Sequence, residues 1–353
     1  MLSRVEKFEA ALAQTECDAV LVTNLKNIYY LTGFSGTEAT VFISKTRRIF
    51  LTDSRYTLIA KGVVKGFDII ETRDALGEIA KIIADDKIKT IGFDDEISYH
   101  SFKTLEKLFS DYKLTAMTAF IENLRMIKDE GEIATIRKAC QISDQAFLDV
   151  LDFIKPGQTT ELQVMNFLDA RMRQLGASGA SFDFIIASGY RSAMPHGVAS
   201  EKVIQTGETL TMDFGCYYNH YVSDMTRTIH VGHVTDEERE IYDIVLRSNQ
   251  TLIEAAKAGM TRIEFDQVPR KVINDAGYGQ YFTHGIGHGI GLDIHEIPYF
   301  GKSSEPIEAG MVLTDEPGIY LDGKYGVRIE DDILITETGC ELLTLAPKEL
   351  IVI

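Results

Sequence analysis

The chain has 353 residues, of which 45% are hydrophobic and 25% are charged, a composition typical of a folded globular protein. Its 53 acidic residues outnumber the 36 basic ones, which gives a formal net charge of −17, and no basic run is longer than Arg47-Arg48. Because nucleic-acid binding needs a basic face, we expect no nucleic-acid partner.

The four cysteines lie far apart and include no C-x-x-C pair, which argues against a disulfide framework and against a thiolate zinc site. Charged residues interrupt the opening segment MLSRVEKFEAALAQ, where a signal peptide would need an apolar run. No apolar stretch approaches the roughly 18 residues that span a bilayer. We therefore expect a cytoplasmic protein with no membrane partner.

Residues 1–124 alternate between helical and strand patterns. Apolar residues recur at helical spacing over 5–12, and further helices are predicted at 56–65 and 74–86. Short apolar runs predict strands at 18–24, 28–34, 40–44, 47–52 and 90–95. This order predicts a small α/β domain with a mixed or parallel sheet.

The pattern changes near Arg125, where we place the start of a second domain over residues 125–353. A long amphipathic helix is predicted at 133–154, and Lys-Pro-Gly at 155–157 ends it. Thr159 or Thr160 then caps a helix at 161–176.

Beyond Gly176 the chain becomes rich in strand patterns. Alternating segments at 209–232 and 311–336 surround turns and predict antiparallel hairpins. The second domain is therefore expected to be α+β.

Asp213 lies on the polar face of an otherwise apolar strand, TLTMDFG, where a buried charge needs a partner. Asp224, in VSDMTRT, follows at a distance that suits the returning strand of a hairpin. The two carboxylates can then converge on one point and bind a metal ion, although aspartates in hairpins are commonly turn residues.

The segment HGIGHGIG contains a His-x-x-x-His pair, but its glycines exclude the helical zinc motif. In an extended chain His284 and His288 share one side, while the glycines permit close approach of another backbone. One imidazole can bind a metal while the other contacts a substrate. The alternative is a glycine-rich structural loop with incidental histidines.

Glu316 in LTDEPGIY and Glu330 in VRIEDD flank a glycine-rich turn. Asp315 precedes Glu316, but neighbouring residues on a strand point to opposite faces, so only one of the two can point inward. Two aspartates, one histidine and two glutamates form an oxygen-rich ligand set for two divalent ions such as manganese, cobalt or zinc. Two such ions can activate water at neutral pH, which indicates hydrolysis.

With these motifs the sequence resembles the pita-bread metallopeptidases, and among them the aminopeptidase P and prolidase branch that cleaves Xaa-Pro bonds. The resemblance covers essentially the whole chain and rests on the order and approximate spacing of PHG at 195–197, MDFG, SDMTRT, HGIGHGIG, the His-Glu at 295–296, EPGIY and RIED. It implies a creatinase-like α/β first domain, a pita-bread second domain and two divalent metal ions per subunit, with Mn²⁺ favoured over Co²⁺ or Zn²⁺.

The resemblance also implies the role of each site residue. Asp213 would bind one metal ion, Asp224 and Glu330 would bridge both ions, and His288 and Glu316 would bind the other. Glu316 would also manage the proton of the attacking water. The substrate side would be lined by His196, His284, His295 and Arg328, with His196 and His295 also taking part in catalysis.

Simpler roles remain open for several of these residues. His196 could be a surface histidine, His295 could be a residue of the chain that leads to Ile297-Pro298, and Arg328 could be a structural partner of Asp332. Asp315 departs from the family pattern, which usually has a small apolar residue or Asn before the glutamate.

The motifs YYLTGF and LTDSRY also resemble the family's first domain, which implies a homodimer. Tyr30, Asp53, Arg55 and Tyr56 could be core and ion-pair residues or dimer contacts, and structural roles are favoured. Proline-containing peptides are the expected substrates, with a slight preference for aminopeptidase P over prolidase.

Three other interpretations fit the sequence less well. Methionine aminopeptidases commonly lack such a first domain, and creatinase is metal-free. A catalytically silent, peptidase-like binding protein would be expected to lose ligands, whereas all five positions are present here.

Overall fold

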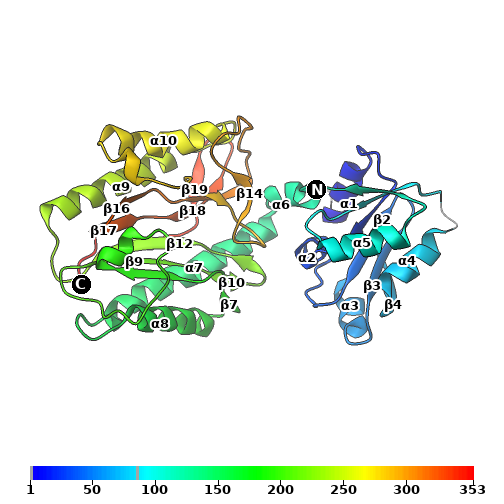
Figure 1. The fold of residues 1–353 in the computed structure, drawn as a ribbon, viewed down its shortest axis with the longest axis horizontal. Coiled ribbons are helices and arrows are strands. Elements are labelled where there is room, and N and C mark those ends of the chain that lie inside the picture. Colours follow the sequence, from blue (N-terminus) through cyan, green and yellow to red (C-terminus); the bar gives the residue numbers. More distant parts are fainter. Residues whose placement is uncertain (1–2, 85–86) are drawn as a thin grey trace. The chain divides into compact units, whose positions relative to one another are not determined.

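The computed structural model describes residues 3–84 and 87–353 (Figure 1). The chain divides into two compact units, Met1–Arg125 and Met126–Ile353. Within the described ranges, no helix combines the length and the hydropathy needed to cross a membrane.

The first unit is built on a six-stranded mixed sheet with the order β4-β3-β2-β1-β5-β6. β1 pairs antiparallel with β2 and parallel with β5, which confirms the predicted α/β class. The strands are β1 (Ala19–Val22), β2 (Thr40–Ser44), β3 (Arg48–Thr52), β4 (Asp68–Glu71), β5 (Thr90–Phe93) and β6 (Lys113–Ala116). The helices α1 (Arg4–Leu12), α3 (Thr57–Val63), α4 (Ala75–Ile83), α5 (Tyr99–Leu108) and α6 (Phe120–Met126) accompany the sheet. Residues 85 and 86, at the end of one predicted helix, lie outside the described residues.

The strand predicted at 28–34 is wrong, because this segment belongs to the helix α2 (Leu25–Thr32). Asn24 caps the helix by accepting hydrogen bonds from the backbone N–H groups of Lys26 and Asn27. Gly33 ends it in the left-handed conformation at φ 75°. The aromatic and branched residues between these caps indicated a strand, but the caps and burial against the sheet decide for the helix.

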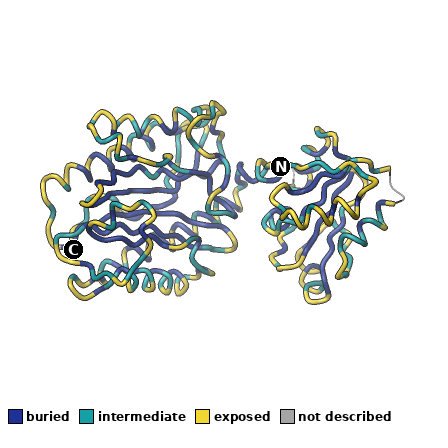
Figure 2. The backbone as a smooth tube through the Cα atoms, viewed as in Figure 1, coloured by how far each residue is buried: buried dark blue, intermediate teal, exposed yellow. Residues whose placement is uncertain are grey.

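The second unit places two helical layers around a set of strands, as Figure 1 shows for α7 and α8 on one side and α9 and α10 on the other. The helices are α7 (Glu130–Phe153), α8 (Glu161–Gln174), α9 (Asp236–Ala255) and α10 (Arg262–Asp275). One apolar core packs α7 and α8 against strands that include β8 (Ile185–Ser188), β9 (Thr209–Phe214) and β12 (Met225–His230). A second core packs α9 and α10 against β15 (Val312–Asp315), β16 (Gly318–Leu321), β17 (Tyr325–Arg328) and β18 (Asp331–Ile335). The strands between the helices are correspondingly buried (Figure 2).

The remaining elements are short. They are the strands β7 (Gly179–Ala180), β10 (Cys216–Tyr218), β11 (Tyr221–Val222), β13 (His288–Gly289), β14 (Glu296–Tyr299) and β19 (Cys340–Leu342), and the 3₁₀ turns at Gly189–Ala193 and Gly279–Tyr281.

Helix α7 and its neighbour confirm the predicted helices at 133–154 and 161–176, and Thr160 is the residue that caps α8. The strand-rich expectation beyond Gly176, by contrast, left out α9 and α10. Both begin with a capping box, formed by Thr235 with Glu238 and by Thr261 with Glu264. That signal was present in the sequence and would have located both helices.

Both predicted hairpins exist, and each is interrupted at its middle. β9 pairs antiparallel with β12, while β10 and β11 between them leave for another sheet. Likewise β15 pairs with β18, while β16 and β17 between them form a separate two-stranded sheet. The breaks fall where the predicted ligands Asp224, Glu316 and Glu330 lie. A residue in such a break is released from strand alternation and can turn its side chain toward a common centre.

Candidate metal centre and substrate cavity

All nine residues proposed for the site line one cavity of about 450 Å³ in the second unit. They come from four parts of that unit. These are the β9–β12 hairpin, the glycine-rich segment with the turn that follows it, the β15–β18 hairpin, and the loop before β9 that carries His196. The nine are Asp213, Asp224, His288, Glu316, Glu330, His196, His284, His295 and Arg328.

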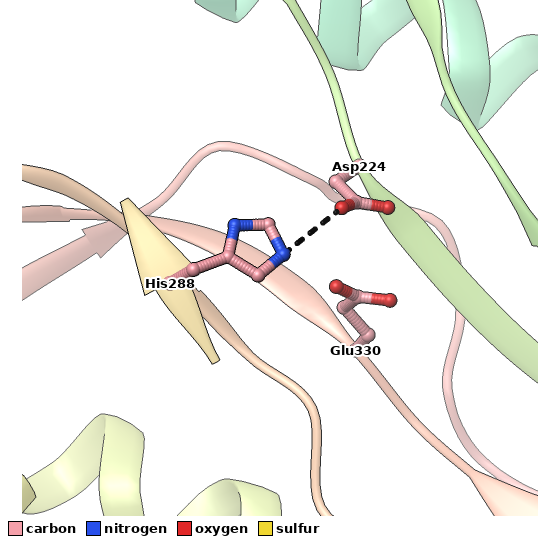
Figure 3. Close-up of side chains that lie close together, drawn as sticks. All are labelled: Asp224, His288 and Glu330. Carbon is pink, nitrogen blue, oxygen red and sulfur yellow. Dashed lines mark ion pairs between the residues drawn. The ribbon is translucent and has the colours of Figure 1, made fainter. Parts of the chain in front are cut away.

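Three of these side chains converge closely. One ligand atom each from Asp224, His288 and Glu330 lies within 4.8 Å of the others. Figure 3 shows the imidazole of His288 facing both carboxylates, with its Nε2 atom 3.7 Å from Oδ2 of Asp224. All three residues are buried. A histidine nitrogen and two carboxylates at this separation suit one divalent ion.

His288 is oriented by its own backbone neighbourhood. Its Nδ1 atom lies 3.1 Å from the carbonyl oxygen of Gly289. Because a carbonyl only accepts, Nδ1 carries the hydrogen and the lone pair of Nε2 points toward Asp224 and toward Glu316, whose Oε1 atom is 3.8 Å away. Burial lowers the pKa of His288 to about 4, which keeps the ring neutral and able to bind a metal.

The glycines around His288 are needed for close backbone packing, as the sequence suggested. A Cβ atom on Gly289 would lie 2.6 Å from the carbonyl oxygen of Ile297, and one on Gly287 would lie 2.3 Å from that of Thr314. The extended pairing predicted for the whole segment is limited to His288–Gly289. His284 and His288 nevertheless line the same cavity, while Ile286 is fully buried in the core.

The neighbouring acids Asp315 and Glu316 point in different directions. Glu316 lines the cavity. Asp315 is fully buried, and its Oδ2 atom accepts a hydrogen bond of 3.1 Å from the side-chain amide of Asn249 on α9. Asn249 makes the same contact with Asp331, the residue that pairs with Asp315 across the two strands. The departure from the family pattern therefore lies behind the site and faces α9.

The electrostatics of the cavity fit divalent cations. Burial and mutual repulsion raise the pKa values of Asp224 and Glu330, and burial raises the pKa of Glu316 to about 8. Within the described chain, Oδ1 of Asp213 and Oδ1 of Asp224 are buried and have no hydrogen-bond partner. Metal ions would neutralise the charge of these carboxylates and would give both unpaired oxygen atoms a partner. The donor set therefore fits two divalent ions.

Arg328 pairs with Asp213, and the alternative of a pair with Asp332 is wrong. Its Nη2 atom lies 2.5 Å from Oδ2 of Asp213, and its Nε atom donates to the hydroxyl of Thr226 at 3.0 Å. Asp332 instead accepts hydrogen bonds from the backbone N–H of Asp224 and from the thiol of Cys140.

Tyr320 is a site residue to which the sequence assigned no role. Its hydroxyl accepts a hydrogen bond from Nη1 of Arg328 at 2.8 Å and therefore donates its own hydrogen to Nε2 of His284, also at 2.8 Å. Nδ1 of His284 then donates to the carbonyl oxygen of Gly285. Both ring nitrogens of His284 are thus engaged. The EPGIY motif contains Tyr320, but its partners lie on other segments, so the motif alone could not give it a function.

His196 and His295 are the most accessible of the site histidines, and both are exposed. The ring of His295 packs edge-on against that of His288, with 4.3 Å between ring centroids. Burial lowers the pKa of His295, so this ring is also neutral near pH 7. A neutral imidazole at His295 can accept or donate a proton.

Comparisons with known proteins identify the family of the chain. Residues 134–337 match metallopeptidase family M24, and residues 4–127 match the creatinase/prolidase N-terminal domain. An Xaa-Pro dipeptidase of Pyrococcus furiosus is 38% identical over 99% of this chain and 100% of its own length.

Solved structures also resemble the chain over nearly its whole length. The Xaa-Pro dipeptidase from Bacillus anthracis is 44% identical, covers 99% of each chain and has a TM-score of 0.96. The X-Pro aminopeptidase from Thermotoga maritima is 40% identical, covers 98% of this chain and 100% of its own, and has a TM-score of 0.91. Two domains, a carboxylate–histidine centre and these full-length matches lead to one conclusion: the chain belongs to metallopeptidase family M24 and carries a creatinase/prolidase N-terminal domain.

Proposed function

We propose that the chain is a metal-dependent Xaa-Pro dipeptidase that hydrolyses the bond between a first residue and a following proline. The observation that carries the proposal is the convergence of Asp224, His288 and Glu330 in a cavity that Asp213 and Glu316 also line. Xaa-Pro specificity is supported by the names of full-length relatives at 38% to 44% identity.

In this proposal two divalent ions would be held by Asp213, Asp224, His288, Glu316 and Glu330, which line one cavity. When bound, the ions would supply Lewis acidity and would make a water molecule nucleophilic at neutral pH. Arg328 holds Asp213 in place through their ion pair. We favour manganese, with cobalt or zinc as alternatives, and a homodimer as the working assembly.

The residues around the metal positions handle the protons. Water adds its hydroxyl group to the scissile carbonyl carbon, Glu316 takes the remaining proton, and that proton passes to the proline nitrogen as the C–N bond breaks. His196 and His295 face the substrate side and stabilise the developing oxyanion or relay the proton. His284 takes part through Tyr320 and Arg328, because both of its ring nitrogens are engaged.

Proline selectivity has a chemical reason. The proline nitrogen carries no hydrogen in a peptide bond, so the site can surround it without offering an acceptor. An ordinary amide N–H would be buried without a partner, at a cost of roughly 1 to 3 kcal/mol, which corresponds to about fivefold to about 150-fold in specificity.

The choice between dipeptides and longer peptides now favours dipeptides, in contrast to the slight preference drawn from the sequence. A guanidinium can pair with the terminal carboxylate of a dipeptide and can also hydrogen-bond the peptide carbonyl of a longer substrate, so Arg328 does not discriminate between them. Its guanidinium is already engaged by Asp213 and Tyr320. The named relatives are therefore the better guide, and the relatives at 38% and 44% identity are both Xaa-Pro dipeptidases. The aminopeptidase from Thermotoga maritima keeps the second candidate in the test.

The test is a cleavage panel at equal concentration with Met-Pro, Met-Pro-Ala and Met-Ala, using metal-stripped protein supplied with Mn²⁺, Co²⁺ or Zn²⁺. We expect Met-Pro to be cleaved fastest and Met-Ala least. Asp224→Asn serves as the inactive control. Faster cleavage of Met-Pro-Ala would replace the dipeptidase by the aminopeptidase, and equal cleavage of Met-Ala would reject proline selectivity.

A further inference from the structure

The turn that carries His295 is held together by one buried carboxylate. Glu296, the first residue of β14 (Figure 1), accepts hydrogen bonds with its Oε1 atom from the backbone N–H groups of Leu292, at 2.7 Å, and Asp293, at 3.0 Å. The carboxylate thus closes the turn between β13 and β14. His295 is the residue immediately before it.

The other oxygen of this carboxylate faces a buried cation. Oε2 of Glu296 lies 3.2 Å from Nζ of Lys128, and the two side chains are only 6% and 1% exposed. A buried charge that loses its partner is strongly destabilised, so each member of this pair depends on the other. Lys128 is fixed in turn, because its backbone N–H donates to the carbonyl oxygen of Gly310.

The packing around the carboxylate leaves little room for another arrangement. A Cβ atom on Gly291 would lie 2.7 Å from Oε2 of Glu296, so a side chain at this position would displace the carboxylate. The carbonyl oxygen of Gly291 accepts a hydrogen bond from Val222, close to Asp224 in the β9–β12 hairpin. The turn is therefore anchored at its start by the metal-site hairpin and at its end by the Lys128–Glu296 pair.

His295, by contrast, is exposed and lines the cavity, and its ring packs against the ring of His288. Where its ring sits is consequently set by the backbone of the turn. We infer that Glu296 and Lys128 are positioning residues, which hold the turn so that His295 meets the scissile group. This inference rests on the proposed function, in which His295 faces the substrate.

The ion pair allows a test by mutual rescue. Glu296→Gln keeps one acceptor oxygen for the turn but sets an amide N–H₂ against the ammonium group of Lys128. Lys128→Met removes the ammonium group that lies 3.2 Å from Oε2 of the Glu296 carboxylate. In the double variant no ammonium group faces the amide, because the methionine fills the space of the lysine stem while the glutamine oxygen still accepts from Leu292 and Asp293.

The expected kinetic result follows from loss of alignment. Each single variant should lower kcat by about tenfold to a hundredfold, because small displacements of a reacting group are costly. KM and the metal content per chain should change by less than about threefold, and the double variant should recover to within about threefold of the parent. Glu341→Gln, which breaks an exposed ion pair with Arg137, is the control and should leave kcat unchanged.

A purely structural role gives a different result. It would lower the fraction of folded, metal-loaded protein and leave the kcat of the remaining active sites unchanged. Active-site titration with a tight inhibitor distinguishes the two, and an unchanged kcat per titrated site overturns the inference.

Dependence on His295 is tested in a His295→Ala background. If Glu296 acts through His295, adding Glu296→Gln to this background should change kcat by no more than about twofold, because the two effects share one cause. If the kcat of the His295→Ala, Glu296→Gln double variant instead falls by the product of the two single-variant losses, the inference is overturned.

A readout without substrate separates this inference from the proposed function. Amide hydrogen exchange at Leu292 and Asp293, and the NMR signal of the His295 ring, are measured in the metal-loaded parent and in Glu296→Gln. We expect faster exchange and a shifted or broadened ring signal. Failure of the parent to cleave any Xaa-Pro peptide refutes the proposed function, whereas unchanged exchange and ring signals refute the positioning role.

Discussion

Exchanging the adjacent acids Asp315 and Glu316, one at a time, separates the site from its support. Glu316→Gln removes a carboxylate that lines the cavity and lies 3.8 Å from Nε2 of His288. A neutral amide is a weak metal ligand and a poor base, so we expect lost metal occupancy or at least about a hundredfold lower kcat.

Asp315→Asn should be much milder, because its contacts survive the exchange. The asparagine oxygen can still accept from Asn249, as Oδ2 of Asp315 does at 3.1 Å. Burial and the neighbouring Asp331 carboxylate raise the pKa of Asp315, so a neutral side chain is suited to this position. The loss should be limited to about one hydrogen bond, roughly 1 kcal/mol of stability, and less than about tenfold in kcat.

The assay measures metal per chain by elemental analysis after gel filtration, kcat on Met-Pro at saturating Mn²⁺, and the midpoint of thermal unfolding. Measuring unfolding separates lost stability from lost catalysis. The reasoning is refuted if Asp315→Asn loses more metal or more activity than Glu316→Gln, since Asp315 would then be the residue that faces the metals.

Three other predictions follow from the same contacts. Chelation should abolish activity, and Mn²⁺ or Co²⁺ should restore it. Full activity of protein that elemental analysis shows to be free of metal would contradict the metal assignment. Tyr320→Phe removes the hydroxyl between His284 and Arg328 and should lower kcat/KM by about tenfold without changing the circular dichroism spectrum; parent-like kinetics would show that this contact is dispensable. Lys348→Met removes a cation 2.6 Å from the buried Asp331 and should cost about 3 kcal/mol in urea unfolding, and a loss below about 1 kcal/mol would mean that the remaining partners of Asp331 suffice.

The sequence predicted the parts of the site that follow from local pattern. Strand alternation and turn spacing predicted the two antiparallel hairpins that carry Asp213 and Glu316, and the structure has both. The predicted difference in direction between Asp315 and Glu316 is also present, although Glu316 lies in the break after β15, where strand alternation no longer applies. The capping threonine of α8 and the proline-glycine end of α7 were equally local signals.

Prediction from the local sequence pattern failed where helix caps or contacts with distant residues determine the structure. The segment 28–34 has strand-forming residues, yet Asn24 and Gly33 cap it as the helix α2. The interruption of each hairpin was also hidden, because the strands that leave it pair with segments elsewhere in the chain.

The interactions that hold the site residues in place could be found only from the tertiary structure. Lys128 and Glu296 are 168 positions apart, and Asn249 contacts Asp315 from 66 positions away. Hydrogen bonds and ion pairs act only over a few ångströms, so a single sequence cannot reveal which distant residues share them. The sequence determined the types of ligand and their order along the chain, whereas folding decided how the ligands are oriented and which buried charges hold them there.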